Sequence, residues 1–132
     1  MSEQLLVCKA LGALVRQHGE PTETEVNFVA HAALELALGE AENEEVRKVM
    51  QEGGDYRSFL AGITSRPLRA YLFRRVVAAT LLDDTITETE LAVIDLTARS
   101  FGYEEKVVAE YLAWMKDGIA WEKRGAELVA RL

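Results

Sequence analysis

The sequence predicts a single all-α domain, a bundle of seven or eight helices that contains two pseudo-repeats. Three observations predict this class. Apolar residues recur at helical spacing in most segments, and no segment alternates between apolar and polar residues as a strand would. The phrase Thr-Glu-Thr-Glu occurs at 22–25 and again at 87–90, each time where a helix would begin. The length of 132 residues suits one domain with one core.

The first two helices are expected over residues 3–18 and 23–38. Gly19 offers a left-handed stop after the first of them, and Gly39 is expected to end the second. The second segment is apolar almost all round, because its only polar residues after position 25 are Asn27, His31 and Glu35. A helix with so narrow a polar edge is expected to lie near the centre of a bundle.

The rest of the chain is expected to form shorter helices joined by short loops. The expected segments are 43–51, one or two turns within 55–63, 65–82 with Pro67 in its first turn, 88–101, 104–116 and 118–131. Glycines at 53, 54 and 102 mark three of the breaks. Short loops predict that neighbouring helices pack antiparallel, and the last helix is expected to cover the bundle.

Each copy of the repeated phrase has the form of a capping box. Thr22 is followed three residues later by Glu25, and Thr87 is followed in the same way by Glu90. In such a box the Thr hydroxyl accepts from the backbone N–H three residues on, and the Glu carboxylate accepts from the Thr N–H. Two backbone donors that a helix start leaves unsatisfied are thereby paired. We therefore predict a helix start at each threonine.

The two phrases also indicate an internal duplication. Residues 13–26 align with residues 78–91 without a gap, whereas Gly39 aligns with Gly102 only after a two-residue insertion. We predict pseudo-repeats of about 5–50 and 68–116, followed by a C-terminal helix over 118–131. Neither half is long enough to be a comfortable domain by itself, so residues 1–132 are predicted to form one domain.

Composition and charge exclude several classes of function. The net charge of −7 argues against general nucleic-acid binding, which requires Lys and Arg to neutralise phosphates. No uncharged stretch approaches the roughly 20 residues that a membrane-spanning helix needs. The single cysteine, Cys8, lies in an apolar run and is expected in the core. The start Met-Ser-Glu-Gln has no basic segment typical of a signal peptide, so a cytoplasmic location is expected.

The acidic turns are the candidate metal site. Carboxylate oxygens are the ligands that Ca²⁺ and Mg²⁺ prefer. The candidate ligands in the second turn and in the first are Asp83, Asp84, Glu90, Glu25, Glu20 and His18. The loop is not an EF-hand, because Ala79 and Leu81 would occupy its first and third ligand positions. The alternative is structural: acidic side chains favour helix N-termini, and two of these glutamates belong to the capping boxes.

A basic segment lies between the two acidic parts of the chain. Residues 56–75 contain no acid and carry Arg57, Arg66, Arg69, Arg74 and Arg75, interleaved with aromatic residues. This composition is that of an anion-binding patch. The alternative is that the arginines pair internally with acidic neighbours, since their positions point in different directions around a helix.

One turn carries a family resemblance. The residues Asp83, Ile86, Thr87 and Glu90 in "DDTITETE", with Gly102 of "ARSFGY" after them, resemble the TerB-like family, which is named after bacterial tellurite resistance proteins. The first copy offers Gly19, Pro21, Thr22 and Glu25 at the matching positions, while Asp84 stands at the family's usual Gly position. The resemblance implies a compact helical bundle with internal pseudo-symmetry, a stress-associated bacterial setting, and roles in ion binding and protein interaction.

Three hypotheses for function follow. The leading one is a non-enzymatic cytoplasmic TerB-like scaffold that binds other proteins and takes a divalent cation, Ca²⁺ or Mg²⁺, at Asp83 and Glu90. A second is an ion-free homo-oligomer, such as a homodimer, or a partner-binding protein whose contact surface contains Trp114 and Trp121. The third is a hydrolase that uses the acidic-turn carboxylates and His18 as acid–base groups. No nucleophile or cofactor motif accompanies the third hypothesis.

Overall fold

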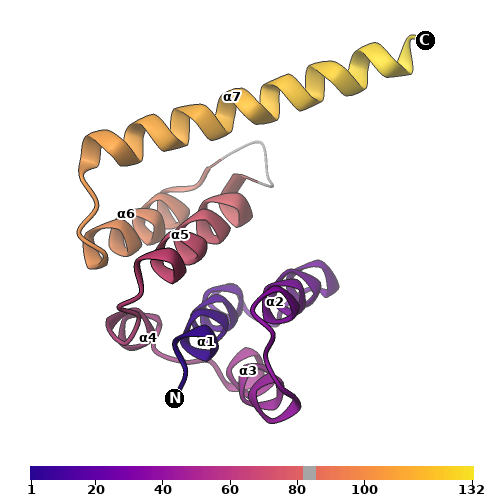
Figure 1. The fold of residues 1–132 in the computed structure, drawn as a ribbon. Helices are drawn as coiled ribbons and strands as arrows, with labels where there is room; N and C mark the ends of the chain where they lie inside the picture. Colours follow the sequence, from indigo (N-terminus) through magenta and orange to yellow (C-terminus); the bar gives the residue numbers. More distant parts are fainter. Residues whose placement is uncertain (82–85) are drawn as a thin grey trace. The chain divides into compact units, whose positions relative to one another are not determined.

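The computed structural model describes residues 1–81 and 86–132, and over these residues it is all-α, as predicted (Figure 1). Within the described ranges there are seven helices and no strand. The helices are α1 (Glu3–Arg16), α2 (Glu23–Glu35), α3 (Glu40–Glu52), α4 (Tyr56–Ala61), α5 (Arg66–Leu81), α6 (Glu88–Ser100) and α7 (Glu105–Ala130).

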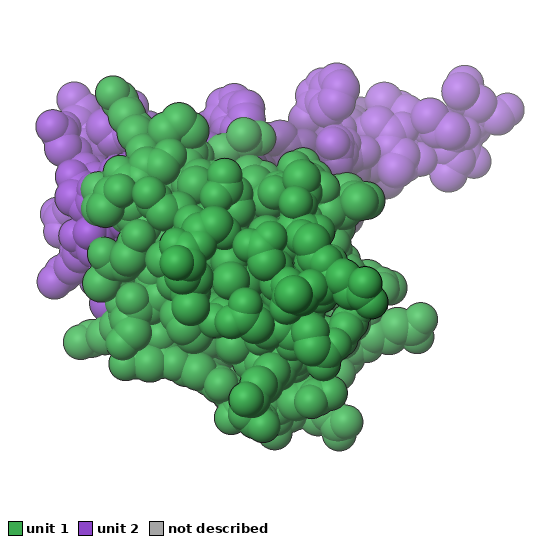
Figure 2. Space-filling view, turned by 60° about the horizontal axis from the view of Figure 1, so that its bottom comes forward, with its two compact units in different colours: residues 1–76 green, residues 77–132 purple. Residues whose placement is uncertain are grey.

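The chain divides into two compact units, Met1–Val76 and Val77–Leu132, coloured separately in Figure 2. The first unit contains α1 to α4 and the larger part of α5. The second contains the end of α5 with α6 and α7. That the two units form one domain stays a prediction.

Helix α1, and not α2, is the centre of the first unit. It packs against α2, α3 and α4 (Figure 1), and an unbroken run from Val7 to Val15 is buried. In α2 only Val29 and two alanines are buried, and Leu34 is 78% exposed. The expected central position of the second helix is therefore wrong. Apolar content alone did not rank the two helices, because α1 also presents its small residues and its one glycine to neighbouring helices.

Small residues let α3 approach α1 closely. A Cβ atom built on Gly12 would lie 3.3 Å from Cγ of Met50 and 3.6 Å from the carbonyl oxygen of Val46. The neighbouring Cys8 is buried, as predicted. Burial raises the pKa of its thiol to about 12, so Cys8 is a small core residue and not a nucleophile.

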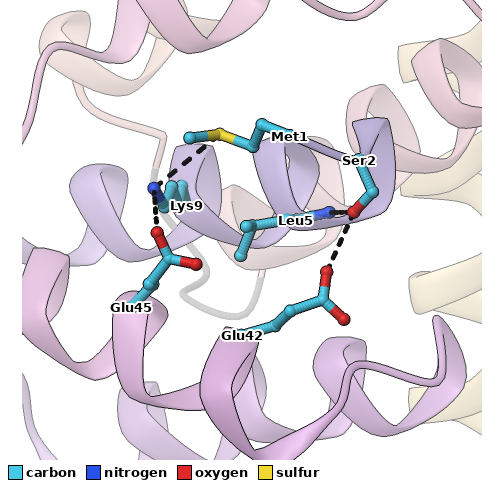
Figure 3. A network of polar contacts seen from close by, with 6 residues as sticks. All are labelled: Met1, Ser2, Leu5, Lys9, Glu42 and Glu45. Atoms are coloured by element: carbon cyan, nitrogen blue, oxygen red, sulfur yellow. Dashed lines mark hydrogen bonds and ion pairs between the residues drawn. The ribbon is translucent and has the colours of Figure 1, made fainter.

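Polar contacts fasten the start of α1 to α3 (Figure 3). The Ser2 hydroxyl accepts from the backbone N–H of Leu5 at 3.2 Å, which caps α1, and donates to Glu42 at 3.0 Å. One helical turn further on, the buried Lys9 ammonium lies 3.2 Å from Oε1 of Glu45. These contacts fix the rotation of α3 about the central helix.

Glu3 connects the start of α1 to the start of α5. Its Oε1 accepts from the backbone N–H groups of Thr64 and Ser65, the latter at 2.8 Å, and its Oε2 accepts from the Thr64 hydroxyl at 3.1 Å. The backbone donors of Ser65 and Thr64 lower the pKa of Glu3. An α1 side chain thus satisfies donors just ahead of α5 that would otherwise be unpaired.

The expected break between 104–116 and 118–131 does not exist. A single helix, α7, runs from Glu105 to Ala130 through Gly118. One glycine disfavours a helix but does not stop it unless the chain also turns there. The C-terminal segment also does not cover the bundle, because from residue 116 to residue 132 all positions are exposed.

The helix bounds repeat at the spacing that separates Thr22 from Thr87. Moving forward 65 positions takes the end of α1 to the end of α5, both bounds of α2 to those of α6, and the start of α3 to the start of α7. Buried positions repeat with them, as in Val29 and Ile94, Ala32 and Thr97, and Ala33 and Ala98. This spacing is kept without a gap from α1 to the start of α7.

The expected two-residue insertion before Gly102 is therefore wrong. The counterpart of Gly102 is Ala37, and both are left-handed, with φ of 73° and 56°. The hydrogen bonds agree: Leu38 N donates to Ala33 O, and Tyr103 N donates to Ala98 O, each closing the same helix-ending motif. The alignment went astray because an alanine occupies a position where glycine is the usual signal.

Ala37→Gly is expected to raise the free energy of unfolding by about 0.5–1 kcal/mol. A left-handed alanine is strained by its Cβ, and glycine is not. Ala37 is exposed, so the substitution removes no buried contact. Urea denaturation followed by circular dichroism measures the change.

The control for Ala37→Gly is Ala30→Gly, an exposed position inside α2. Glycine there is expected to lower the free energy of unfolding by about 1 kcal/mol, because it only weakens the helix. If both variants lose stability, Ala37 is not strained in the folded protein.

Candidate functional site

Both predicted capping boxes are present. Thr22 Oγ1 accepts from Glu25 N at 3.2 Å, and Glu25 Oε1 accepts from Thr22 N at 2.9 Å. At the second turn Thr87 Oγ1 accepts from Glu90 N at 3.2 Å, and Glu90 Oε1 accepts from Thr87 N at 3.3 Å. Each glutamate therefore has a structural partner at the start of α2 or α6.

The candidate metal ligands are not gathered into a site within the described residues. His18 and Glu20 are exposed in the turn between α1 and α2, and Glu25 is half-buried at its capping box. Asp83 and Asp84 lie outside the described residues. Across residues 1–81 and 86–132, no group of three or more His, Cys, Asp or Glu side chains is placed to hold a metal ion. Cation binding through Asp83 and Asp84 stays a prediction.

Two arginines of the basic segment are used internally. The Arg75 guanidinium lies 4.4 Å from the ring centroid of Phe28, donates to the Phe28 carbonyl at 2.9 Å and lies 3.6 Å from Glu35 Oε1. The Tyr71 hydroxyl donates to the same carboxylate at 3.0 Å. Burial first, and this hydrogen bond second, raise the pKa of Tyr71 to about 12. The Arg69 Nε donates to the Ile63 carbonyl at 2.7 Å.

These contacts favour the structural interpretation of the basic segment at Arg69 and Arg75. Tyr56 and Phe73, two of the interleaved aromatics, are buried in the core. The remaining arginines, 57, 66 and 74, are exposed and separate along α4 and α5. The segment fastens α5 to α2 and to the loop before α5, and it presents no continuous aromatic and basic surface.

An open pocket of about 540 Å³ lies in the first unit between α1, α2 and α3. Its lining residues are Arg16, Glu20, Pro21, Val26, Arg47, Met50 and Gln51. Arg47 is already paired with Glu44, and Glu20 brings a negative charge into the lining. The charges therefore do not single out an anionic or a cationic ligand.

Helix α7 offers the most distinctive surface. One apolar face is half-buried and contains Val108 and Leu112, which line a pocket of about 210 Å³ together with residues of α6. A second face carries Trp114 and Trp121, which are 66% and 77% exposed. The ring centroids of Tyr111 and Trp114 lie 5.8 Å apart on this face. A helix that packs on one side only does not need apolar residues on a second face.

We name this second face the outer stripe and define it by the residues that follow one another at alternating spacings of four and three. They are Val107, Tyr111, Trp114, Gly118, Trp121, Gly125, Leu128 and Leu132. Spacings that average 3.5 residues keep a set of side chains on one narrow face of a helix. The sequence predicted the two tryptophans as contact residues, but splitting α7 at Gly118 hid the continuity of the stripe.

Comparisons with family models, with curated proteins and with solved structures found no match to this chain. The TerB-like resemblance therefore stays a prediction. In the part of the chain that the structure describes, none of the helices combines the length and the apolar character needed to cross a membrane.

Proposed function

We propose that the protein is a non-enzymatic interaction scaffold whose contact surface is the outer stripe of α7. The observation that carries the proposal is the exposure of Trp114 and Trp121 on a helix that already has another apolar face toward α6. Tryptophan and tyrosine are enriched at the energetic centres of protein interfaces, and a lone soluble chain gains nothing by exposing them.

The proposal does not require a cation. The glutamates of both acidic turns have structural partners in the capping boxes, so the turns have a role without an ion. A TerB-like role in stress response, with Ca²⁺ or Mg²⁺ at Asp83 and Glu90, is a hypothesis that rests on the sequence resemblance alone.

Site-specific photo-crosslinking in living cells tests the contact surface. A photoreactive phenylalanine derivative replaces Trp121 in one variant and Lys116 in the other. Both positions are exposed on α7, but Lys116 lies off the outer stripe. We expect polypeptide adducts from position 121 at about ten times the yield from position 116, because only the stripe is an interface. Equal yields from the two positions would contradict the proposal, whatever the adducts contain.

A further inference from the structure

The outer stripe carries an alternation of large and absent side chains. Trp114 and Trp121 are seven residues apart, and so are Gly118 and Gly125, which follow each tryptophan by four positions. Along the face, each bulky ring is thus succeeded by a notch with no side chain. Knobs and notches of this kind are how two helices pack at close distance.

Nothing inside the protein accounts for the two glycines. A Cβ atom built on Gly118 or on Gly125 would meet no atom within 4 Å, so neither position is glycine to make room for a described neighbour. Glycine is the poorest helix former after proline, and both lie in the interior of α7. Their place on the stripe points to a helix from outside the chain that approaches the α7 backbone.

We propose that this helix is the α7 of a second copy of the chain, bound antiparallel, an inference that rests on the proposed function of the stripe. Antiparallel pairing about the middle of the stripe brings Trp121 opposite Gly118 of the second copy, and Trp114 opposite its Gly125. The same register brings Tyr111 opposite Leu128 and Val107 opposite Leu132. Every layer of the stripe then has a partner, because the pattern is the same when it is read from either end.

Parallel pairing does not give such a fit. In a parallel pair of identical helices each residue faces its own counterpart. Trp114 and Trp121 would then meet tryptophans, and the layers at Gly118 and Gly125 would be empty. Crowded layers would hold the helices apart exactly where the empty layers need them close, and the lost contacts would not be regained.

Charges along one edge of the stripe also favour the antiparallel register. Glu110, Asp117, Arg124 and Arg131 follow one another at spacings of seven along this edge. Within the described residues none of the four is in an ion pair. Antiparallel pairing places Asp117 level with Arg124 of the second copy, and Glu110 level with its Arg131. Parallel pairing places Asp117 near Glu122 of the second copy, which is repulsive.

The exposed area is sufficient for a specific but weak dimer. Trp114, Trp121, Val107 and Leu128 are each between 46% and 77% exposed. Over two copies these side chains offer roughly 1,000 Å² for burial, which is the lower end of specific interfaces. We therefore expect a dissociation constant in the micromolar range.

Analytical ultracentrifugation of the full chain over a concentration series tests the inference. The wild type is expected to move from monomer to dimer at roughly micromolar concentrations. Gly118→Leu with Gly125→Leu is expected to weaken association at least about tenfold, because the new side chains meet the tryptophans of the second copy. Trp114→Ala with Trp121→Ala is expected to weaken it as well, because the notches are left unfilled.

The decisive sample is a mixture of these two double variants. In a heterodimer the leucines of one chain face the alanines of the other, and the remaining tryptophans face glycines. Association in the mixture is therefore expected to recover to within about tenfold of the wild type. The same logic applies to Asp117→Arg and Arg124→Asp, which repel themselves but complement each other only in the antiparallel register.

Lys116→Leu with Lys123→Leu is the matched control. It adds the same two leucines at the same spacing, on the opposite face of α7. Self-association is expected to equal that of the wild type. Circular dichroism verifies that all variants keep the helical content of the wild type.

A wild type that stays monomeric at about 200 μM would overturn the inference. Leucines at 118 and 125 that strengthen association would also overturn it, because a merely adhesive surface gains from added apolar area. The proposed function fails separately: adducts from position 121 that contain only other polypeptides would leave the stripe as an interface and remove the second copy from it.

Discussion

Leu11→Ala is expected to lower the free energy of unfolding by about 3 kcal/mol, the largest effect of a single substitution that we predict. Leu11 lies in the middle of α1 and is fully buried. Truncation removes its contacts and leaves a cavity where α1 meets α2, α3 and α4, and such a cavity does not close completely. Since total stability is commonly about 5–15 kcal/mol, the midpoint of urea denaturation is expected to fall clearly.

The control for Leu11→Ala is the same substitution at Leu34, in α2. Leu34 is an exposed leucine in the helix that the sequence predicted to be central. Leu34→Ala is expected to change the free energy of unfolding by less than about 0.5 kcal/mol. A loss at Leu34 as large as that at Leu11 would contradict the assignment of α1 as the central helix.

Local features of the fold could be predicted because all the atoms involved lie close together in the chain. A capping box joins residues three positions apart, so Thr22 and Thr87 identified their helix starts without knowledge of any packing. The left-handed conformations of Gly19, Gly53 and Gly102 were readable for the same reason. Helix periodicity was enough for the all-α class.

Features that depend on packing could not be predicted from the pattern. Both α1 and α2 are rich in apolar residues, and which one lies at the centre depends on how α3 and α4 close around them. The register of the repeat was obscured at Ala37, where strain is tolerated without the expected glycine. At Gly118 the opposite occurred: its counterpart in the first repeat, Gly53, ends α3 with a φ of 85°, whereas α7 continues.

The candidate site was predictable only in part. Trp114 and Trp121 were identified as contact residues from their spacing, but the stripe became apparent once α7 proved continuous and exposed. Helical spacing shows which side chains share a face, and it does not show whether that face is covered. The acidic turns illustrate the converse, since their glutamates were correctly placed in capping boxes from sequence alone.

The second large effect concerns the contact between Lys9 and Glu45, where removing either partner is expected to have unequal results. The Lys9 side chain is 10% exposed, and its ammonium lies 3.2 Å from Glu45 Oε1. Glu45→Ala leaves a nearly buried positive charge without its partner, and is expected to lower the free energy of unfolding by about 2 kcal/mol. Lys9→Met removes the buried charge and fills the same space, so the change is expected to be less than about 1 kcal/mol, in either direction.

The double variant Lys9→Met with Glu45→Ala separates charge from packing. If the loss in Glu45→Ala comes from the unpaired ammonium, the double variant is expected to be more stable than Glu45→Ala alone. Glu44→Ala is the control, because Glu44 pairs with Arg47 on the exposed side of the same helix. Solvent screens that pair, so its loss is expected to be less than about 0.5 kcal/mol. A double variant as unstable as the sum of its parts would show that Glu45 acts through packing and not through the charge of Lys9.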